Sequence, residues 1–133
     1  MATLSDDQAR PFFLGANRTF TAKFTSADLV DPDTNPEGRV NLTGATVYYT
    51  WKDQPGDDNP AKLALLTGAG IVHQAQTGDG EGKADITVLF SDTAGLEPGK
   101  FFRDVWAVLS GDNRKITLGP DVVELREAIL VLP

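Results

Sequence analysis

The sequence predicts an all-β fold in which two packed sheets form an antiparallel β-sandwich of about seven to nine strands. Apolar and polar residues alternate over short stretches, most regularly at 45–52 and 84–90. The 13 glycines and 8 prolines are spread over the 133 residues at the joints between such stretches, and long helical periodicity is missing. We therefore expect one domain, residues 17–133, preceded by an irregular N-terminal arm, residues 1–16.

Residues 84–109 hold the clearest pattern. From Ala84 to Phe90 every second residue is apolar, which predicts a strand with one face in the core. A second strand is expected from Lys100 to Leu109. The segment between them, SDTAGLEPG, contains a Pro-Gly pair that cannot continue a ladder, so it predicts a corner between the sheets. Leu96 in that corner is expected to plug the core, with Phe101 beside it.

The remaining elements follow from alternation and from turn residues. Trp51 is expected at the aromatic centre of the core. Segments 27–44, 53–60 and 78–83 are rich in glycine, proline, aspartate and asparagine, which predicts loops, with a short edge piece at Val40 and Leu42. The expected strands are Arg18–Phe24, Ala45–Lys52 and Ile71–Gln76, while Lys62–Thr67 fits either a strand or a helical turn.

The C-terminal part predicts a hairpin. SGDN is a turn signal between the strand ending at Leu109 and a strand at Arg114–Leu118. Gly119-Pro120 is expected to break that strand, and the apolar pattern resumes at Val122 and ends in the apolar run 128–132. A strand this apolar would aggregate at a bare edge, so we expect its own sheet or another chain to cover it.

The strand at 100–109 is apolar on both sides. One side carries Phe101, Val105, Ala107 and Leu109, and the other carries Phe102, Trp106 and Val108. Only one side of a sheet meets the core of a sandwich, so the second side is expected to be exposed in an isolated monomer. Either it is a protein interface, or the arm covers it through Phe12 and Phe13. The predicted interface residues are Phe12, Phe13, Phe102, Trp106, Val108, Ile129 and Val131.

The N-terminal arm itself has two interpretations. Residues 1–16 show no sustained period, and a short apolar island follows a polar leader. Either its phenylalanines tuck onto their own domain, or the arm docks on a neighbouring subunit.

The amino-acid composition excludes several classes of binding partner and site. The formal net charge of −7 and the pI near 4.5 argue against nucleic acid and against an anionic membrane surface. The chain has no cysteine, which excludes disulfides and thiolate metal sites. We find no signal peptide and no apolar run of membrane-spanning length, so we expect synthesis in a cytoplasm.

The sequence predicts neither a catalytic residue nor a cofactor. His73 is the only histidine, and no G-x-S-x-G motif accompanies any serine. A carboxylate pair of Asp85 and Asp104 is conceivable, but nothing in the sequence selects the separation that it needs. Residues 31–35 have the D-x-D-x-N spacing of calcium loops, but Pro36 replaces the required glycine, and Leu42 replaces the bidentate glutamate. This loop is either a calcium site or a solvated acidic loop.

Several motifs together carry a family resemblance. They are the strand Arg18–Phe24, the segment LTGATV at 42–47, the strand Ala84–Phe90 followed by Ser-Asp-Thr, and the corner Leu96-x-Pro98-Gly99-x-Phe101 followed by Asp104-Val105. In this order they resemble the immunoglobulin-like domains of phage virion proteins, notably the N-terminal domain of baseplate upper proteins. The corner also resembles those of fibronectin type III domains, although Phe101 lacks the usual tyrosine hydroxyl.

The resemblance implies a non-enzymatic virion structural protein. It would assemble in multiple copies in the tail, baseplate or fibre-attachment region, and its partners would be other virion proteins and copies of itself. A capsid decoration or head-to-tail connector subunit is the alternative. A glycan-binding or adhesive fibronectin-like module is an alternative of another class.

Overall fold

The computed structural model describes residues 2–4, 12–14, 16–53, 61–109 and 115–127, and over these residues the chain is all-β. The α-helix within this part of the chain is a single turn. The elements are β1 (Ala2–Leu4), β2 (Phe12–Phe13), β3 (Arg18–Phe24), η1 (Ala27–Leu29), β4 (Thr46–Lys52), β5 (Leu63–Thr67), β6 (Gly70–His73), η2 (Gly78–Gly80), β7 (Lys83–Val88), α1 (Phe90–Thr93), β8 (Gly99–Val108) and β9 (Lys115–Arg126). No described helix has the length and apolar character needed to cross a membrane.

The described strands form one nine-stranded sheet in the order β1-β3-β7-β6-β5-β4-β8-β9-β2. The prediction of purely antiparallel pairing is wrong at two places, because β5–β6 and β2–β9 run parallel. At β5–β6 the cause is local. Gly68 and Gly70 have φ values of 88° and 98°, which let the chain close a small loop and continue in the same direction.

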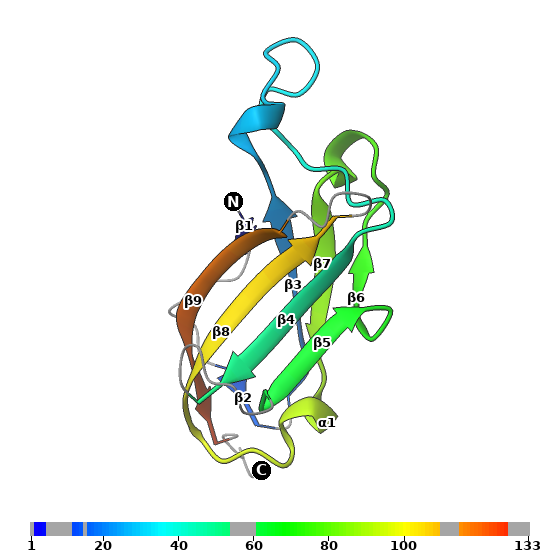
Figure 1. The fold of residues 1–133 in the computed structure, drawn as a ribbon. Helices are drawn as coiled ribbons and strands as arrows, with labels where there is room; N and C mark the ends of the chain where they lie inside the picture. Colours follow the sequence, from blue (N-terminus) through cyan, green and yellow to red (C-terminus); the bar gives the residue numbers. More distant parts are fainter. Residues whose placement is uncertain (1, 5–11, 15, 54–60, 110–114, 128–133) are drawn as a thin grey trace, which may run out of the picture.

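The sheet curves back on itself, so that β3 and β7 lie behind β4 and β8 (Figure 1). Ring contacts join the two halves across the interior. Phe20 of β3 meets Tyr49 of β4 with ring centroids 5.3 Å apart. At the ends of the sheet, β1 also lies close to β9. The concave side of the curved sheet therefore encloses the core.

Trp51 lies at the centre of this core, as predicted. It is fully buried, and its indole nitrogen donates a hydrogen bond of 2.8 Å to the Tyr49 hydroxyl. Phe101 stacks on it at 5.5 Å between ring centroids. Leu96 is half-buried against the same cluster, which confirms its predicted role. Burial of the indole together with a partner for its N–H explains why a tryptophan is suited to this position.

The strand predictions hold for β3, β4, β7 and β8, to within two residues at each end. Alternation is their common signal, and it selected the core side correctly: Ala45, Val47, Tyr49 and Trp51 are all buried. Of the two possibilities for residues 62–67, the strand is correct. Val40 and Leu42 do not form a strand, although both are buried. Instead Val40 N–H bonds to Phe24 O, and Leu42 N–H bonds to the Gln76 side chain.

The predicted break at Gly119-Pro120 is wrong, because β9 runs through it from Lys115 to Arg126. Arg103 pairs with Asp121, and Val105 pairs with Leu118. Two residues of β9, Gly119 and Pro120, therefore lie opposite one residue of β8, which is a β-bulge. A bulge tolerates proline because the extra residues need not donate to the ladder.

Within residues 1–16, the strands β1 and β2 belong to the sheet. This differs from an irregular arm and agrees with the interpretation in which this part tucks onto its own domain. Leu4 of β1 pairs with Ala22 of β3, and Phe12 of β2 pairs with Leu125 of β9. These short strands lack a readable period because two or three residues are too few to show alternation.

Candidate protein interface

A row of aromatic and aliphatic side chains crosses the outer side of three neighbouring strands. Leu66 of β5 pairs with Tyr48 of β4, which pairs with Trp106 of β8. Paired residues of antiparallel strands share one face, and the buried hydrophobic residues of all three strands occupy the other. The Tyr48 and Trp106 rings stack with centroids 5.1 Å apart and planes 16° apart.

A second row lies further along the same strands. Lys52 of β4 pairs with Phe102 of β8, which pairs with Val122 of β9. Val122 is 45% exposed, and Leu66 in the first row is 39% exposed. We call Tyr48, Leu66, Phe102, Trp106 and Val122 the outer aromatic face. Its residues span four strands, and the Thr50–Asp104 pair lies between the two rows.

The prediction that Phe102, Trp106 and Val108 are exposed in a single chain is wrong in degree, since all three are half-buried. Cross-strand neighbours cover them: Tyr48 covers one side of Trp106, and Phe102 lies between Lys52 and Val122. The prediction that they share the outer side is confirmed by the register. Val108 pairs with Thr46 at the other end of this surface.

Phe12 is placed differently from the prediction, because it is a core residue. Its ring meets Trp51 at 4.9 Å and Phe20 at 6.1 Å between centroids. The Arg18 guanidinium lies over the same ring, 4.2 Å from its centroid. Phe12 is buried, so it does not cover the outer aromatic face as one interpretation of the arm required.

Phe13 lies on the outer side. Parallel pairing with β9 places Phe13 opposite Arg126, and it is half-buried. It therefore extends the outer side of the sheet beyond Val122. Ile129 and Val131, the other two predicted interface residues, lie outside the described residues.

Charged side chains lie beside and between the two rows of the outer aromatic face. Among the described outward-facing residues, Lys52, Lys100 and Arg126 are basic, and Asp104 and Glu124 are acidic, which gives +3 − 2 = +1. Arg126 donates hydrogen bonds of 2.9 and 3.3 Å to the Glu124 carboxylate. This contact lowers the pKa of Glu124 and raises that of Arg126. The face is thus slightly basic, whereas the whole chain carries −7.

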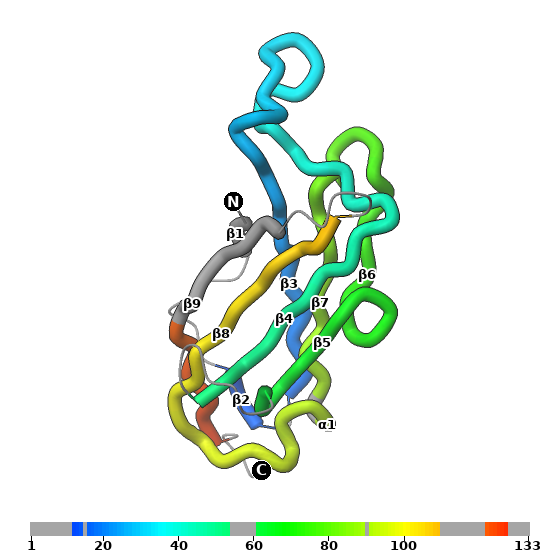
Figure 2. The backbone as a smooth tube through the Cα atoms, viewed as in Figure 1, coloured from blue at the N-terminus to red at the C-terminus, as the bar shows by residue number. Residues whose placement is uncertain are grey.

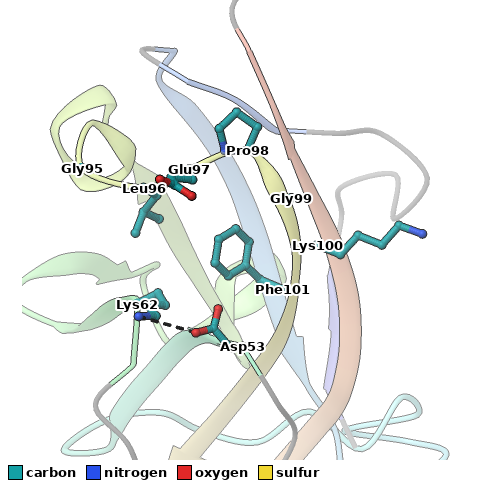
Figure 3. A pocket seen from close by; sticks show the side chains of 9 residues that line it. All are labelled: Asp53, Lys62, Gly95, Leu96, Glu97, Pro98, Gly99, Lys100 and Phe101. Atoms are coloured by element: carbon teal, nitrogen blue, oxygen red, sulfur yellow. Dashed lines mark ion pairs between the residues drawn. The ribbon is translucent and has the colours of Figure 1, made fainter.

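A shallow cleft of about 460 Å³ lies at one end of the sheet (Figure 3). Leu96, Glu97 and Phe101 contribute to its lining. At its rim the Lys62 ammonium and the Asp53 carboxylate are 3.5 Å apart, and both side chains are about half exposed. Glu97 and Lys100 also line the cleft, so its two acidic and two basic side chains give no net charge.

His73 takes part in a hydrogen-bonded corner. Its Nε2 lies 2.9 Å from the Thr67 hydroxyl, and that hydroxyl accepts the Val47 N–H at 2.8 Å. Burial lowers the pKa of His73. The histidine thus joins the end of β6 to β5 and β4, where the chain crosses between the two halves of the sheet.

The carboxylates of Asp85 and Asp104 do not form a pair. Both residues face outward, but β7 and β8 belong to opposite halves of the curved sheet. Asp85 accepts hydrogen bonds from Thr21 at 2.8 Å and from Gln74 at 2.9 Å. Its surroundings are those of a surface carboxylate bonded to its neighbours.

Residues 31–35 form a closed turn. The Asp31 carboxylate accepts the backbone N–H groups of Asp33 at 2.9 Å and Thr34 at 3.4 Å. These bonds, that of Asp33 first, lower the pKa of Asp31. The described residues contain no group of three or more potential metal-binding side chains. The carboxylate that a calcium loop would turn toward the ion caps the turn instead.

Sequence reasoning missed Tyr48, Leu66 and Val122 as members of the face. Alternation along 45–52 did place Tyr48 on the side away from the core. That β4 and β5 lie beside β8 follows from strand order, which periodicity does not contain. Strand order together with register would have identified the whole row.

Comparisons with known proteins add little to this geometry. No family model matches the chain, and no curated protein matches it. Among solved structures, murine CRIg aligns over 97% of this chain and 99% of that chain, with 11% sequence identity and a TM-score of 0.40. A likeness of this size supports no inference about function, so the proposals below depend on the sequence and on the outer aromatic face.

Proposed function

We propose that this chain is a non-enzymatic structural protein of a phage virion, and that it assembles in multiple copies through its outer aromatic face. The tail, baseplate or fibre-attachment region is the proposed location, and the protein is synthesised in the host cytoplasm. Its partners are other virion proteins and copies of itself. The family resemblance of the sequence motifs supports the virion role, and the outer aromatic face is the observation that carries the assembly role.

We further propose that the curved sheet is an immunoglobulin-like β-sandwich. The packing of β3 and β7 against β4 and β8 supports this, as does the corner between β7 and β8. The Phe20–Tyr49 and Phe12–Phe20 contacts join the two layers.

The composition of the face supports a protein partner. Aromatic residues are enriched in protein interfaces, and they supply much of the binding free energy because they bury a large area. Tyr48 and Trp106 are already stacked, so little side-chain entropy remains to be lost on binding. Leu66 beside this pair and Val122 beside Phe102 leave apolar surface in contact with water.

A capsid decoration or connector subunit would use the same face, so it remains the alternative location. A glycan-binding module is the alternative of another class. Sugar rings stack on open aromatic faces, but Tyr48 and Trp106 each cover one face of the other. This arrangement favours assembly over sugar stacking.

Incorporation into particles tests the proposal. Trp106→Ala should lower the copy number of the chain in purified particles by about tenfold or more. The matched control is Val72→Ala, which changes a 69% exposed residue on the opposite half of the sheet and should leave incorporation unchanged. Quantitative mass spectrometry of purified particles measures the copy number of each variant. A wild-type chain that is missing from particles, or equal incorporation of both variants, would contradict the proposal.

A further inference from the structure

We propose that copies of this chain assemble head to tail, with the loop at 27–37 of one copy docking on the outer aromatic face of the next. This inference rests on the proposed function and specifies which part of a neighbouring copy the face receives. We call residues 27–37 the acidic tip.

The acidic tip combines apolar and acidic side chains. Leu29 and Val30 are 40% and 50% exposed, so they are two of the most exposed large apolar residues that the structure describes. The tip also contains three aspartates and one glutamate and no lysine or arginine, a formal charge of −4. It stands away from the sheet at one end of the molecule (Figures 1 and 2). This position leaves it accessible to a neighbouring copy.

The tip is already ordered in the single chain. Asp31 and Asn35 exchange backbone hydrogen bonds of 2.8 Å in both directions. The Asn35 side chain donates to Leu29 O at 3.2 Å and to Arg39 O at 3.1 Å, and it accepts Arg39 N–H at 2.9 Å. At its base, Glu37 forms ion pairs with Lys23 at 3.0 Å and Arg39 at 2.6 Å. A preformed loop loses little conformational entropy on docking.

The face offers the complementary chemistry. Lys52 and Lys100 border the Phe102–Val122 row, and the lysine at 100 faces Glu124, whose carboxylate is also bonded to Arg126. Aromatic surface there can bury Leu29 and Val30, while the Lys100 ammonium can meet the Asp33 carboxylate of the tip. Opposite charges at the edge of an apolar contact favour one orientation and speed association.

Charge also selects head-to-tail docking over symmetric docking. Two outer aromatic faces brought together would place a net charge of +1 against +1, and two tips would bring −4 against −4. Tip on face brings opposite net charges together. Because the two patches differ, the contact is heterologous, and it closes into a ring or extends as a filament.

Charge reversal on each side tests the docking. Face variant Lys52→Glu/Lys100→Glu and tip variant Asp28→Lys/Asp33→Lys should each weaken self-association about tenfold or more in sedimentation velocity over a concentration series. Their equimolar mixture should regain association, because each tip then meets a face of opposite charge. Self-association of the wild type should also weaken as salt is raised.

Cysteine pairing gives a second measurement that does not depend on charge reversal. The chain has no cysteine, so Asp33→Cys and Lys100→Cys each introduce a single thiol. Mixed under oxidising conditions, they should form a disulfide-linked heterodimer in preference to either homodimer, whereas Val72→Cys in place of Lys100→Cys should not. Far-UV circular dichroism of each variant checks that it is folded.

Three results would overturn the inference. A tip variant that associates like the wild type would indicate a symmetric face-to-face contact. If the equimolar mixture of the two charge-reversal variants does not regain self-association, the tip and the face do not contact each other in one interface. A wild-type chain that remains monomeric alone but is incorporated into particles through Trp106 would assign the face to another virion protein, and it would leave the proposed function in place.

Discussion

The two outer faces of the curved sheet differ in how their side chains are satisfied. On β3 and β7 the Thr19 and Thr87 hydroxyls are 3.0 Å apart, and Thr21 donates to Asp85 at 2.8 Å. Gln74 donates to the same carboxylate at 2.9 Å. The polar side chains of this face form hydrogen bonds with one another across the strands, so they have partners within the same chain.

The outer aromatic face on β4, β5, β8 and β9 consists mainly of apolar side chains instead. Tyr48 stacks on Trp106, and Leu66 and Val122 at the margins remain 39% and 45% exposed. Apolar area left in water costs about 25 cal/mol per Å², which a partner can recover. Val72 on the polar face is more exposed still, but it stands alone, as scattered surface residues do. A contiguous row, rather than the exposure of any one residue, distinguishes the two faces.

The largest expected effect lies at the boundary between core and outer face, which passes between Phe12 and Phe13. Phe12→Ala should lower the free energy of unfolding by about 3–5 kcal/mol, because it leaves a cavity beside Trp51 and Phe20. Phe13→Ala should lower it by about 1 kcal/mol or less, because the ring lies on the outer side. Urea unfolding followed by tryptophan fluorescence measures both.

Equal losses from these neighbouring phenylalanines would contradict the placement of β2 against β9. They would also return residues 1–16 to the status of an arm that only rests on the domain.

Replacing two aromatic residues by threonine should make the outer aromatic face resemble the polar face on β3 and β7. Phe102→Thr combined with Trp106→Thr should leave a folded chain that is about 1–2 kcal/mol less stable, since aromatic cross-strand contacts are lost. Its incorporation into particles should fall at least as far as that of Trp106→Ala. Thermal unfolding and particle copy number are the measurements. Normal incorporation of a fully folded double variant would show that the difference between the faces has no role in assembly.

Much of this comparison could be predicted from alternation alone. Alternation identified four strands, the buried side of each and Trp51 as a core residue, because burial of one side of a strand requires a period of two. It also placed Phe102 and Trp106 together on the outer side. These properties are local, so a single sequence contains them.

The predictions that failed concern contacts between segments that are distant in the sequence. Phe12 became a core residue because β2 pairs with β9 from the other end of the chain, and two residues carry no period. Gly119 and Pro120 form a bulge within β9, and the bulge is recognised only from the pairing of β9 with β8. Leu66 joined the face through strand order. Pairing partners and strand order are long-range facts, and no local pattern specifies them.

Removing one carboxylate from each face should have unequal effects. Asp85→Ala should lower the free energy of unfolding by about 1–2 kcal/mol, because Thr21 and Gln74 lose their acceptor. Asp104→Ala should change it by about 0.5 kcal/mol or less, because this carboxylate has no hydrogen bond or ion pair among the described residues. Chemical denaturation at neutral pH measures both variants. A larger loss for Asp104→Ala would reverse the proposed contrast between a bonded face and an apolar one.

The smallest effect concerns His73, at the corner that joins the two halves bearing these faces. Burial lowers its pKa in the folded chain below the ordinary value of 6.5, so the unfolded chain binds more protons between the two values. The free energy of unfolding should therefore decrease as the pH falls below about 6.5, and this contribution should level off once the pH is below the folded pKa.

The variant His73→Gln isolates this contribution, because glutamine can still bond to the Thr67 hydroxyl but does not titrate. The difference in unfolding free energy between wild type and variant should change between about pH 8 and about pH 5, with the wild type losing more at the lower pH. Parallel pH profiles would mean that the imidazole is as accessible to protons in the folded chain as in the unfolded one. The corner between β5 and β6 would then be open to water rather than packed, and the two halves of the sheet would be less firmly joined than the Thr67–His73 contact implies.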